Sequence, residues 1–420
     1  MAGKATFITI IGFTLLFMVA IKNFGRISTD SVGNMVNYYN EMIAHNIAVS
    51  GANLASNQIF IDPTWDDGYS NKSFSGGTLN VSVQNSNGYK KIIKITSTGS
   101  YHGASNSVIV TLSPSKFSKF AYFSESEGGA IWWNGTDTVW GPFHTQDVLR
   151  AAYRPVFFGK ASSLKNIEYY ENKNKNKHKP YFLGGYEPGV NLPLPKDAVD
   201  GLETFADDDG LKFSGKDTVY LYFVNDSLKY KYSYSASYTT IYLPTAANNG
   251  MIFVKNSVVR LKGTVKGQYT VACNNSTASE NGKGTVYLDD DIVYNKDPKL
   301  YPNSTDLLGI CAENDVIVTD NKPNNKDINI QASIYCEKGG FSVQNYDRNK
   351  PVDGKVIFRG NINLVGGIIQ KTRGAVGTIG SGGSIATGFA KRYKYDDRFL
   401  VASPPFFPGT GSFEIVSWFE

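Results

Sequence analysis

The chain has 420 residues, of which 41% are hydrophobic and 13% aromatic, and it contains 42 glycines. This length allows one large domain or two, and the aromatic and glycine content predicts β structure with many turns. The 42 basic and 37 acidic residues give a net charge of only +5, without a basic stripe, which argues against a nucleic-acid-binding protein.

The first predicted element is an uncharged apolar run from Ala5 to Ile21, which lies between Lys4 and Lys22. As a helix it would be about 26 Å long, at the short end of what spans a bilayer. A secretory signal sequence is usually shorter and ends at a small-residue cleavage site, and no such site follows Lys22. We therefore expect residues 1–28 to be a retained transmembrane or assembly helix.

Residues 29–60 form the second element, an amphipathic continuation of that helix. Its apolar residues recur at steps of three, four or seven, which is helical spacing. They include Val32, Met35, Val36, Tyr39, Met42, Ile43, Ile47, Leu54 and Ile59. Two interpretations stay open: a core helix of the following domain, or a long helix of which half is packed and half projects.

Residues 61–115 are expected to form a small antiparallel β unit. Three short β-branched runs, Thr78–Val83, Ile92–Thr96 and Ser107–Leu112, are separated by turn sequences rich in Ser, Asn and Gly.

Beyond Phe117, residues 116–420 contain many β runs of three to five residues with glycines at their corners. Examples are Met251–Val254, Val258–Leu261 and Val316–Val318. Runs this short suit the coils of a parallel, right-handed β-helix-like solenoid, in which each coil buries its inward residues on the next. An ordinary β-sandwich is the alternative. Residues 162–214 are polar and predict a loop-rich insert.

Two features of residues 116–420, the predicted head, suggest specific contacts. Leu228–Tyr234 is rich in tyrosine and predicts a hairpin with Val219–Phe223. The sequences around Cys311 and Cys336 align at an offset of 25, so one solenoid coil of that length would stack the two cysteines. A disulfide and two buried thiols are both compatible with this spacing.

The sequence contains no motif typical of a catalytic or metal site. None of the four histidines has a second ligand at metal-binding spacing. For His144 we favour buried packing with a hydrogen bond over a role as general base, and for Arg398 an ion pair with Asp396 or Asp397. The clusters Asp207–Asp209 and Asp289–Asp291 could bind Ca²⁺ or cleave a glycan, but an acidic turn and a bend between coils explain them more simply. We expect no enzyme activity and no cofactor.

The order of the elements, a short Lys-flanked N-terminus, an apolar helix, an amphipathic continuation and a β-rich head, resembles that of type IV pilin-like proteins. Residues 44–60 and the hairpin within 91–113 are similar to the corresponding segments of PilX-like pilus assembly proteins. Classical pilins carry a glutamate five residues into the mature chain, and this sequence has no counterpart to it. A cut after Gly3 would place Ile8 at that position. At Gly12, where the sequence resembles the classical junction, Phe17 stands in place of the glutamate.

The head resembles a family of bacterial proteins known only as a domain of unknown function, the DUF4900 type. The similarity rests on motifs that are specific together. They are Trp140–Asp147, Pro155–Gly159, Leu308–Gly309, Gly366–Gly377, Tyr393–Arg398, Pro404–Pro408 and Phe413–Glu420.

These resemblances imply a bacterial structural subunit of a type IV pilus-like extracellular filament. It would sit in the inner membrane before assembly, need a pilus-like assembly machinery, and then form a helical homopolymer at the cell surface, with the helices in the core and the heads outside. The expected core-packing residues are Phe7, Ile8, Ile11, Leu15, Leu16, Met18 and Val19. A minor PilX-like component and a membrane-anchored β-helix polysaccharide lyase or hydrolase are the alternatives.

Overall fold

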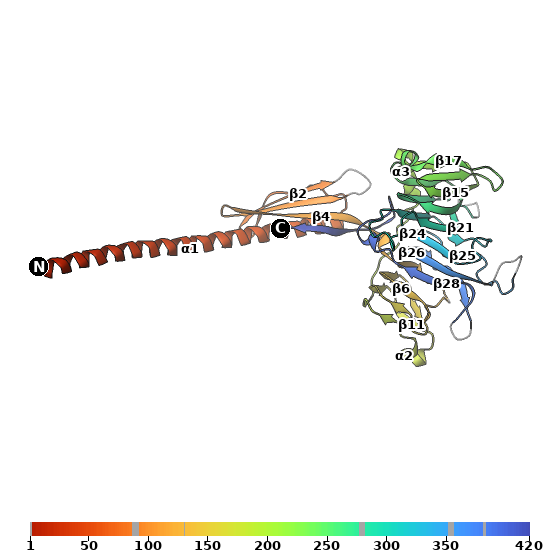
Figure 1. The fold of residues 1–420 in the computed structure, drawn as a ribbon, viewed down its shortest axis with the longest axis horizontal. Helices are drawn as coiled ribbons and strands as arrows, with labels where there is room; N and C mark the ends of the chain where they lie inside the picture. The colour runs from red at the N-terminus through yellow and green to blue at the C-terminus, as the bar shows by residue number, and fades with distance from the viewer. Residues whose placement is uncertain (1, 86–91, 130, 277–281, 352–356, 381–383) are drawn as a thin grey trace. The chain divides into compact units, whose positions relative to one another are not determined.

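The computed structural model describes residues 2–85, 92–129, 131–276, 282–351, 357–380 and 384–420. The chain divides into unit 1, residues 1–114 and 412–420, and unit 2, residues 115–411. The protein is mainly β with a long N-terminal helix, an antiparallel sheet and a large, mostly parallel sheet, as predicted from the sequence (Figure 1).

Unit 1 begins with one continuous helix, α1 (Ala2–Ile61), which covers both predicted helical segments. Its residues before Ala44 are exposed or half-buried, whereas a helical stripe from Ala44 to Ile59 is buried. The stripe consists of Ala44, Ile47, Ala48, Ala52, Ala55 and Ile59. This agrees with the second of the two interpretations: the C-terminal end of the helix packs on the sheet, and the part before Ala44 projects.

The buried stripe packs on a five-stranded sheet with the order β1-β2-β3-β4-β29. The strands are β1 (Tyr69–Phe74), β2 (Gly77–Asn85), β3 (Ile93–Tyr101), β4 (Ala104–Lys116) and β29 (Gly409–Phe419). Strands β1 to β4 pair antiparallel, and along β3 buried residues alternate with more exposed ones. This is the pattern of a sheet with one face on a core. Residues 412–420, which we had assigned to the head, belong to unit 1.

Small residues allow the helix and the sheet to approach closely. A Cβ atom on Gly51 of the helix would overlap the side chains of Leu79 and Ser97, and one on Gly99 of the sheet would overlap the backbone of Ala44. Both glycines are therefore required by packing and not by backbone conformation.

Unit 2 is organised around a ladder of ten parallel strands, each from a different turn of the chain. In spatial order they are β14 (Leu211–Phe213), β18 (Met251–Val254), β20 (Gln268–Cys273), β22 (Leu307–Ala312), β24 (Ile328–Cys336), β26 (Phe358–Thr372), β5 (Tyr122–Ser126), β7 (Phe143–Thr145), β10 (Ala161–Ser163) and β13 (Tyr186–Pro188). Successive turns of the chain thus stack by parallel pairing, as expected for a β-helix-like solenoid.

A second parallel ladder runs along another side of the same turns. It joins β15 (Thr218–Asn225), β19 (Val258–Val265), β21 (Thr285–Tyr294), β24, β26, β28 (Ile385–Lys394), β6 (Thr138–Trp140), β9 (Val156–Phe157) and β12 (Tyr181–Phe182). Strands β23 (Val316–Val318) and β25 (Phe341–Val343) continue from β21 on a third side. The short pair β8 (Leu149–Ala151) and β11 (Ile167–Tyr169) is also parallel.

The chain enters this stack in its middle. It starts at β5, winds outward to β13, crosses to the other end at β14, and winds back until β26 pairs with β5 (Figure 1). Residues 162–214, the predicted loop-rich insert, contain the last strands of the outward winding, the crossing segment and the short helix α3 (Glu203–Asp209). Strand β5, the first to be wound, therefore gains its second neighbour only when β26 is in place.

Two apolar clusters fill unit 2. The larger one lies inside the coils, and a second one covers the outer side of the first ladder, where Phe253, Tyr335 and Phe123 pack under Val199 and Leu202 of the crossing segment. The end of the solenoid at β15 is closed by the tyrosine-rich hairpin, as predicted: β16 (Ser227–Lys231) pairs antiparallel with β15 and with β17 (Thr239–Tyr242). An antiparallel hairpin at this end limits further pairing of parallel strands.

The predicted stacking of Cys311 on Cys336 is wrong by one residue. Cys311 pairs with Tyr335 and Cys336 pairs with Ala312, so the two thiols point to opposite faces of their strands. The offset of 25 holds for the next strand pair, where Val316 lies opposite Phe341, because the intervening corner is one residue longer in the later coil. The three cysteines are free and buried.

We predict that Gly51→Ala and Gly33→Ala change stability in opposite directions. Alanine favours helix at both positions, but at Gly51 the added methyl group would enter the buried contact with Leu79, at a cost of about 1–3 kcal/mol. No atom lies within 4 Å of the Cβ position at Gly33, so that variant should be more stable by about 0.5–1 kcal/mol. Chemical unfolding of the full chain in detergent, with hydrogen exchange of β3 to localise the effect, checks both. Equal effects at the two positions would contradict this packing.

Candidate functional site

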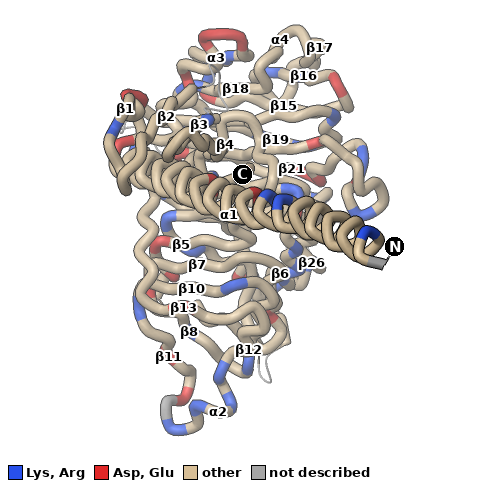
Figure 2. The backbone as a smooth tube through the Cα atoms, turned by 90° about the vertical axis from the view of Figure 1, so that its left-hand side faces the viewer, with Lys and Arg blue, Asp and Glu red and all other residues tan. Residues whose placement is uncertain are grey.

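The most exposed apolar surface of the chain is the N-terminal part of α1. By length and composition this is one helix that could cross a membrane: its most apolar 18-residue window has a mean hydropathy of 2.1, and none of that window is buried. Figure 2 shows the helix almost free of charged positions except at its N-terminal tip and in one short band beyond the apolar run. That band includes Lys22, Arg26 and Asp30.

The seven residues predicted to pack in a filament core all lie exposed on this helix. Their side chains are between 43% (Ile11) and 69% (Ile8) exposed, with Phe7, Leu15, Leu16, Met18 and Val19 between these values. At 100° per residue they cover one half of the helix, and Ile10, Phe13, Phe17 and Ile21, also exposed, cover the other. A helix that is apolar all round is stable only when it is covered on every side.

The polar atoms of this segment are satisfied within the helix. The hydroxyl of Thr9 donates to the carbonyl of Ala5 at 2.9 Å, and the hydroxyl of Thr14 donates to that of Ile10 at 2.5 Å. Such bonds remove the cost of placing a hydroxyl in an apolar environment. The segment can therefore enter lipid or a dry protein core without leaving these side-chain donors unpaired.

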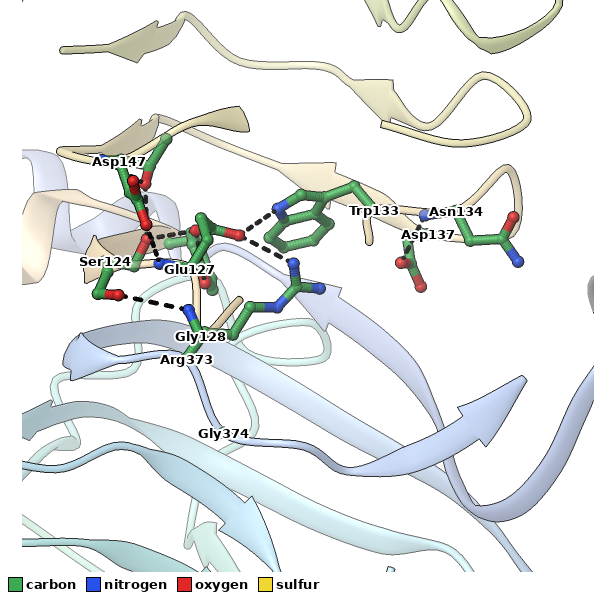
Figure 3. Close-up of polar contacts among 12 residues, drawn as sticks. Ser124, Glu127, Gly128, Trp133, Asn134, Asp137, Asp147, Arg373 and Gly374 are labelled. Carbon is green, nitrogen blue, oxygen red and sulfur yellow. Dashed lines mark hydrogen bonds and ion pairs between the residues drawn. The ribbon is translucent and has the colours of Figure 1, made fainter. Parts of the chain in front are cut away.

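Unit 2 contains a buried polar cluster where its first and last windings meet. The carboxylate of Glu127, at the end of β5, is fully buried and accepts hydrogen bonds from Tyr122, Ser124, Trp133 and Arg373 (Figure 3). The Arg373 guanidinium, at the end of β26, lies 2.9 Å from Glu127 and also covers the Trp133 ring, 4.0 Å from its centroid. A charged carboxylate is tolerated at this depth because each of its oxygens has partners.

Burial dominates the protonation behaviour of this cluster. Burial raises the pKa of Tyr122 well above its usual value, and the neighbouring Glu127 charge raises it further. Burial lowers the pKa of Lys391, which the nearby Asp137 carboxylate, 3.4 Å away, opposes. The raised pKa of Tyr122 keeps its hydroxyl protonated, so that it can donate its hydrogen bond to Glu127 and help to hold the two windings together.

His144 is buried, as expected, and both of its ring nitrogens are hydrogen-bonded. Its Nδ1 lies 2.8 Å from the hydroxyl of Ser162 and its Nε2 lies 3.3 Å from Oε1 of Gln146, whose amide nitrogen donates to Asn191. Because Oε1 can only accept, Nε2 carries the proton and Nδ1 accepts from Ser162. Burial lowers the pKa of His144, which favours this neutral form.

The two acidic clusters are engaged in structural contacts. Asp289 forms an ion pair with Arg260, and its carboxylate accepts a hydrogen bond from Thr319. Asp291 accepts from the backbone and the side chain of Asn329. A register shift in β21 falls at these residues, as expected for a bend.

In the other cluster, Asp207 pairs with Lys212 at 2.7 Å and Asp209 accepts from Asn248 at 2.5 Å. Within the described ranges, no group of three or more His, Cys, Asp and Glu side chains could hold a metal ion. Arg398, as predicted, forms a two-point ion pair with Asp396, at 2.9 and 2.6 Å.

The sequence did not indicate the Glu127–Arg373 pair. Glu127 lies in the polar sequence Ser124–Gly129, which suggests an exposed turn, and Arg373 is 246 residues further along the chain. Both follow strands of the predicted type, but only the pairing of β5 with β26 brings them together.

No family model matches the chain, and no curated protein matches it. Among solved structures, the chain is similar to the competence-associated pilin ComZ from Thermus thermophilus, with a TM-score of 0.33 and 12% sequence identity over 90% of this chain and 97% of that chain. This similarity is too weak to assign a family or a function. The resemblances to PilX-like and DUF4900-type proteins therefore remain predictions.

We predict that breaking the buried pair Glu127–Arg373 lowers stability far more than breaking an exposed pair on the same two strands. Arg373→Met leaves the Glu127 charge buried without its partner and should cost about 3–5 kcal/mol. The matched variant Lys371→Met breaks the ion pair of Lys371 with Glu125 (2.7 Å), which is partly exposed, and should cost about 0–1 kcal/mol.

Urea unfolding of the full chain in detergent measures both effects. Adding Glu127→Gln to Arg373→Met should recover part of the loss, because the unpaired charge is removed. A similar cost for the two single variants would refute the buried-charge explanation.

We predict that His144 makes unit 2 less stable as the pH falls below about 6.5. The pKa of His144 is lower in the folded state than in the unfolded chain, so only the unfolded state binds the proton there. The loss from this residue is at most about 1.4 kcal/mol per pH unit and is absent above pH 7. In His144→Gln the dependence of the unfolding free energy on pH between pH 7 and pH 5 should be flatter than in the unchanged chain. An unchanged slope in His144→Gln would show that the residue is not protonated on unfolding.

Proposed function

We propose that the protein is a structural subunit of a type IV pilus-like extracellular filament. The N-terminal helices form the filament core, and the β-rich heads form its outer surface. Before assembly the helix lies in the inner membrane, from which a pilus-like assembly machinery extracts it. The proposed partners are further copies of the same chain, and the proposed product is a homopolymer at the cell surface.

The single observation that supports this proposal most is the exposed apolar part of α1, in which none of the most apolar window is buried. Contiguous apolar surface of this size is costly in water and marks a contact with lipid or protein. In a filament the seven residues from Phe7 to Val19 would pack against the same segment of neighbouring copies, where close packing supplies the cohesion. Such contacts join different faces of identical subunits and do not close into a ring, which produces a fibre.

The packing of α1 on its sheet supports the same proposal. The buried stripe from Ala44 to Ile59 fixes the helix to unit 1, and Gly51 and Gly99 bring the two elements into close contact. A force along the helix would therefore pass into a packed core and not into a flexible linker. This is a useful property for a subunit that is held only by its N-terminal segment.

The two alternatives have less support. A minor PilX-like component would have the same helix, and only its abundance would differ. A polysaccharide lyase or hydrolase would need available carboxylates, whereas Asp289 and Asp291 are bound by Arg260 and Asn329.

Cysteine crosslinking of native filaments tests the proposal. The three natural cysteines are buried, so cysteines at Leu16 and Val19 would be the exposed thiols, and in a filament core they should crosslink neighbouring copies into a ladder of multimers. The matched variant Val401→Cys, at a residue 92% exposed in unit 2, should not give this ladder. We expect sheared surface filaments composed mainly of this chain.

Two results would overturn the proposal or change it. If the chain stays in the membrane fraction as a monomer and no filament is seen by negative-stain microscopy, the polymer proposal fails. If the chain is a small fraction of filaments built from another subunit, the minor-component alternative replaces it.

A further inference from the structure

We propose that unit 2 carries a binding site for a carboxylated saccharide in the cavity formed by β24, β26, β28 and β6. This inference is independent of the filament proposal, because it concerns one face of the solenoid and no contact between copies. The cavity has a volume of about 320 Å³ and is lined by Thr138, Trp140, Lys299, Asn329, Asn363, Leu364, Arg392, Tyr393 and Lys394. A volume of this size suits one or two sugar rings.

Three cations give the cavity its charge. Lys299, Arg392 and Lys394 are exposed, and in the described part of the chain none of them forms an ion pair with a carboxylate. The lining contains no acidic residue. The lining of the cavity therefore carries a net positive charge, which favours an anionic ligand.

A column of polar side chains crosses the floor of the cavity. The parallel pairing places Asp291, Asn329, Asn363, Arg392 and Thr138 next to one another on five neighbouring strands. The amide of Asn329 donates to Asp291 at 2.9 Å, and its oxygen accepts from the amide of Asn363 at 3.1 Å.

The direction of these hydrogen bonds specifies what a ligand must offer. A carboxylate only accepts, so Asp291 forces the nitrogen of Asn329 toward itself and thereby orients the nitrogen of Asn363 toward Asn329. The oxygen of Asn363 is then left on the side of Arg392. A ligand that fits both groups places a donor, such as a hydroxyl, at Asn363 and an anion beside it at Arg392.

An aromatic platform completes the site. Trp140 lies opposite Lys394 in the ladder, is 47% exposed, and stacks on Phe158 with a centroid distance of 3.7 Å and an interplanar angle of 9°. The stacking restricts the rotation of the indole ring, which stays partly exposed at the cavity. An indole ring packs against the C–H face of a sugar ring, which is apolar although the ring carries hydroxyls.

The combination of features favours a uronic-acid type of sugar over other anions. An anion alone would need only the cations, and a nucleic acid would need a longer row of cations and several stacking aromatics. A hydroxyl adjacent to a carboxylate on a ring with an apolar face matches the acceptor at Asn363, the cation at Arg392 and the platform at Trp140 together.

The test measures binding of oligogalacturonate, alginate and hyaluronan oligosaccharides to the full chain in detergent by calorimetry at physiological salt. At least one of them should bind, and a neutral maltotriose should not. Arg392→Gln should weaken that binding at least tenfold, because it removes the guanidinium charge that would bind the carboxylate of the sugar. Trp140→Ala should weaken binding as well, by removing the platform.

The matched control is Lys175→Gln, in the exposed basic segment Lys173–Lys179, which changes the net charge by the same amount. It should leave binding unchanged. The inference is overturned if none of the three acidic saccharides binds, if maltotriose binds equally well, or if Lys175→Gln weakens binding as much as Arg392→Gln. Tighter binding of a sulfated glycan or single-stranded DNA, lost in Arg392→Gln, would assign the cavity to that ligand and also overturn it. Filament formation by Arg392→Gln distinguishes this failure from failure of the filament proposal.

Discussion

The structure of unit 2 depends on one pairing, that of β5 with β26. A parallel solenoid coil has two open edges, and the chain begins its winding with a strand whose second neighbour is synthesised 246 residues later. Until then one edge of β5 is unpaired, and the Glu127 carboxylate lacks the guanidinium of Arg373. The polar cluster at this junction can therefore form only when β26 reaches β5, and its hydrogen bonds then join the first and last windings.

This constraint explains why polar groups lie inside a solenoid whose other coils are filled by apolar side chains. Along the inner column of the first ladder, Cys336 is followed by Gln370, Ser124, Thr145 and Ser163 on successive strands. Gln370 and Ser124 bond to groups of the junction cluster. Hydrogen bonds are directional, so they fix the register of the closing strand more strictly than an apolar contact would. The buried polar groups therefore determine the register of the junction, and the aromatic rings around them supply the apolar packing that holds it together.

The sequence predicted local structure well and long-range pairing poorly. Met251–Val254 was predicted and coincides with β18, and the hairpin of Val219–Phe223 with Leu228–Tyr234 is present, because alternation and turn residues are local signals. The offset of 25 holds for β23 and β25 but not for the cysteines, because one extra corner residue makes the offset between β22 and β24 equal to 24. A shift by one residue exchanges the two faces of a strand, so a sequence pattern with period two cannot reveal it.

The two candidate sites differ in the same way, because one is visible in the local sequence and the other depends on long-range pairing. The apolar run that begins at Ala5 is local, so its length and composition alone identify it as a segment that could cross a membrane. The cavity at Trp140 and Arg392 is not local, because its lining comes from four strands and a loop distributed between Thr138 and Lys394. In a stacked solenoid, residues hundreds of positions apart become neighbours at the spacing of adjacent strands, about 4.8 Å. A row of side chains at that spacing can bind a sugar ring only after every coil has taken its register. The β5–β26 junction, which determines that register for β6 and β28, is thus also the condition for the binding site.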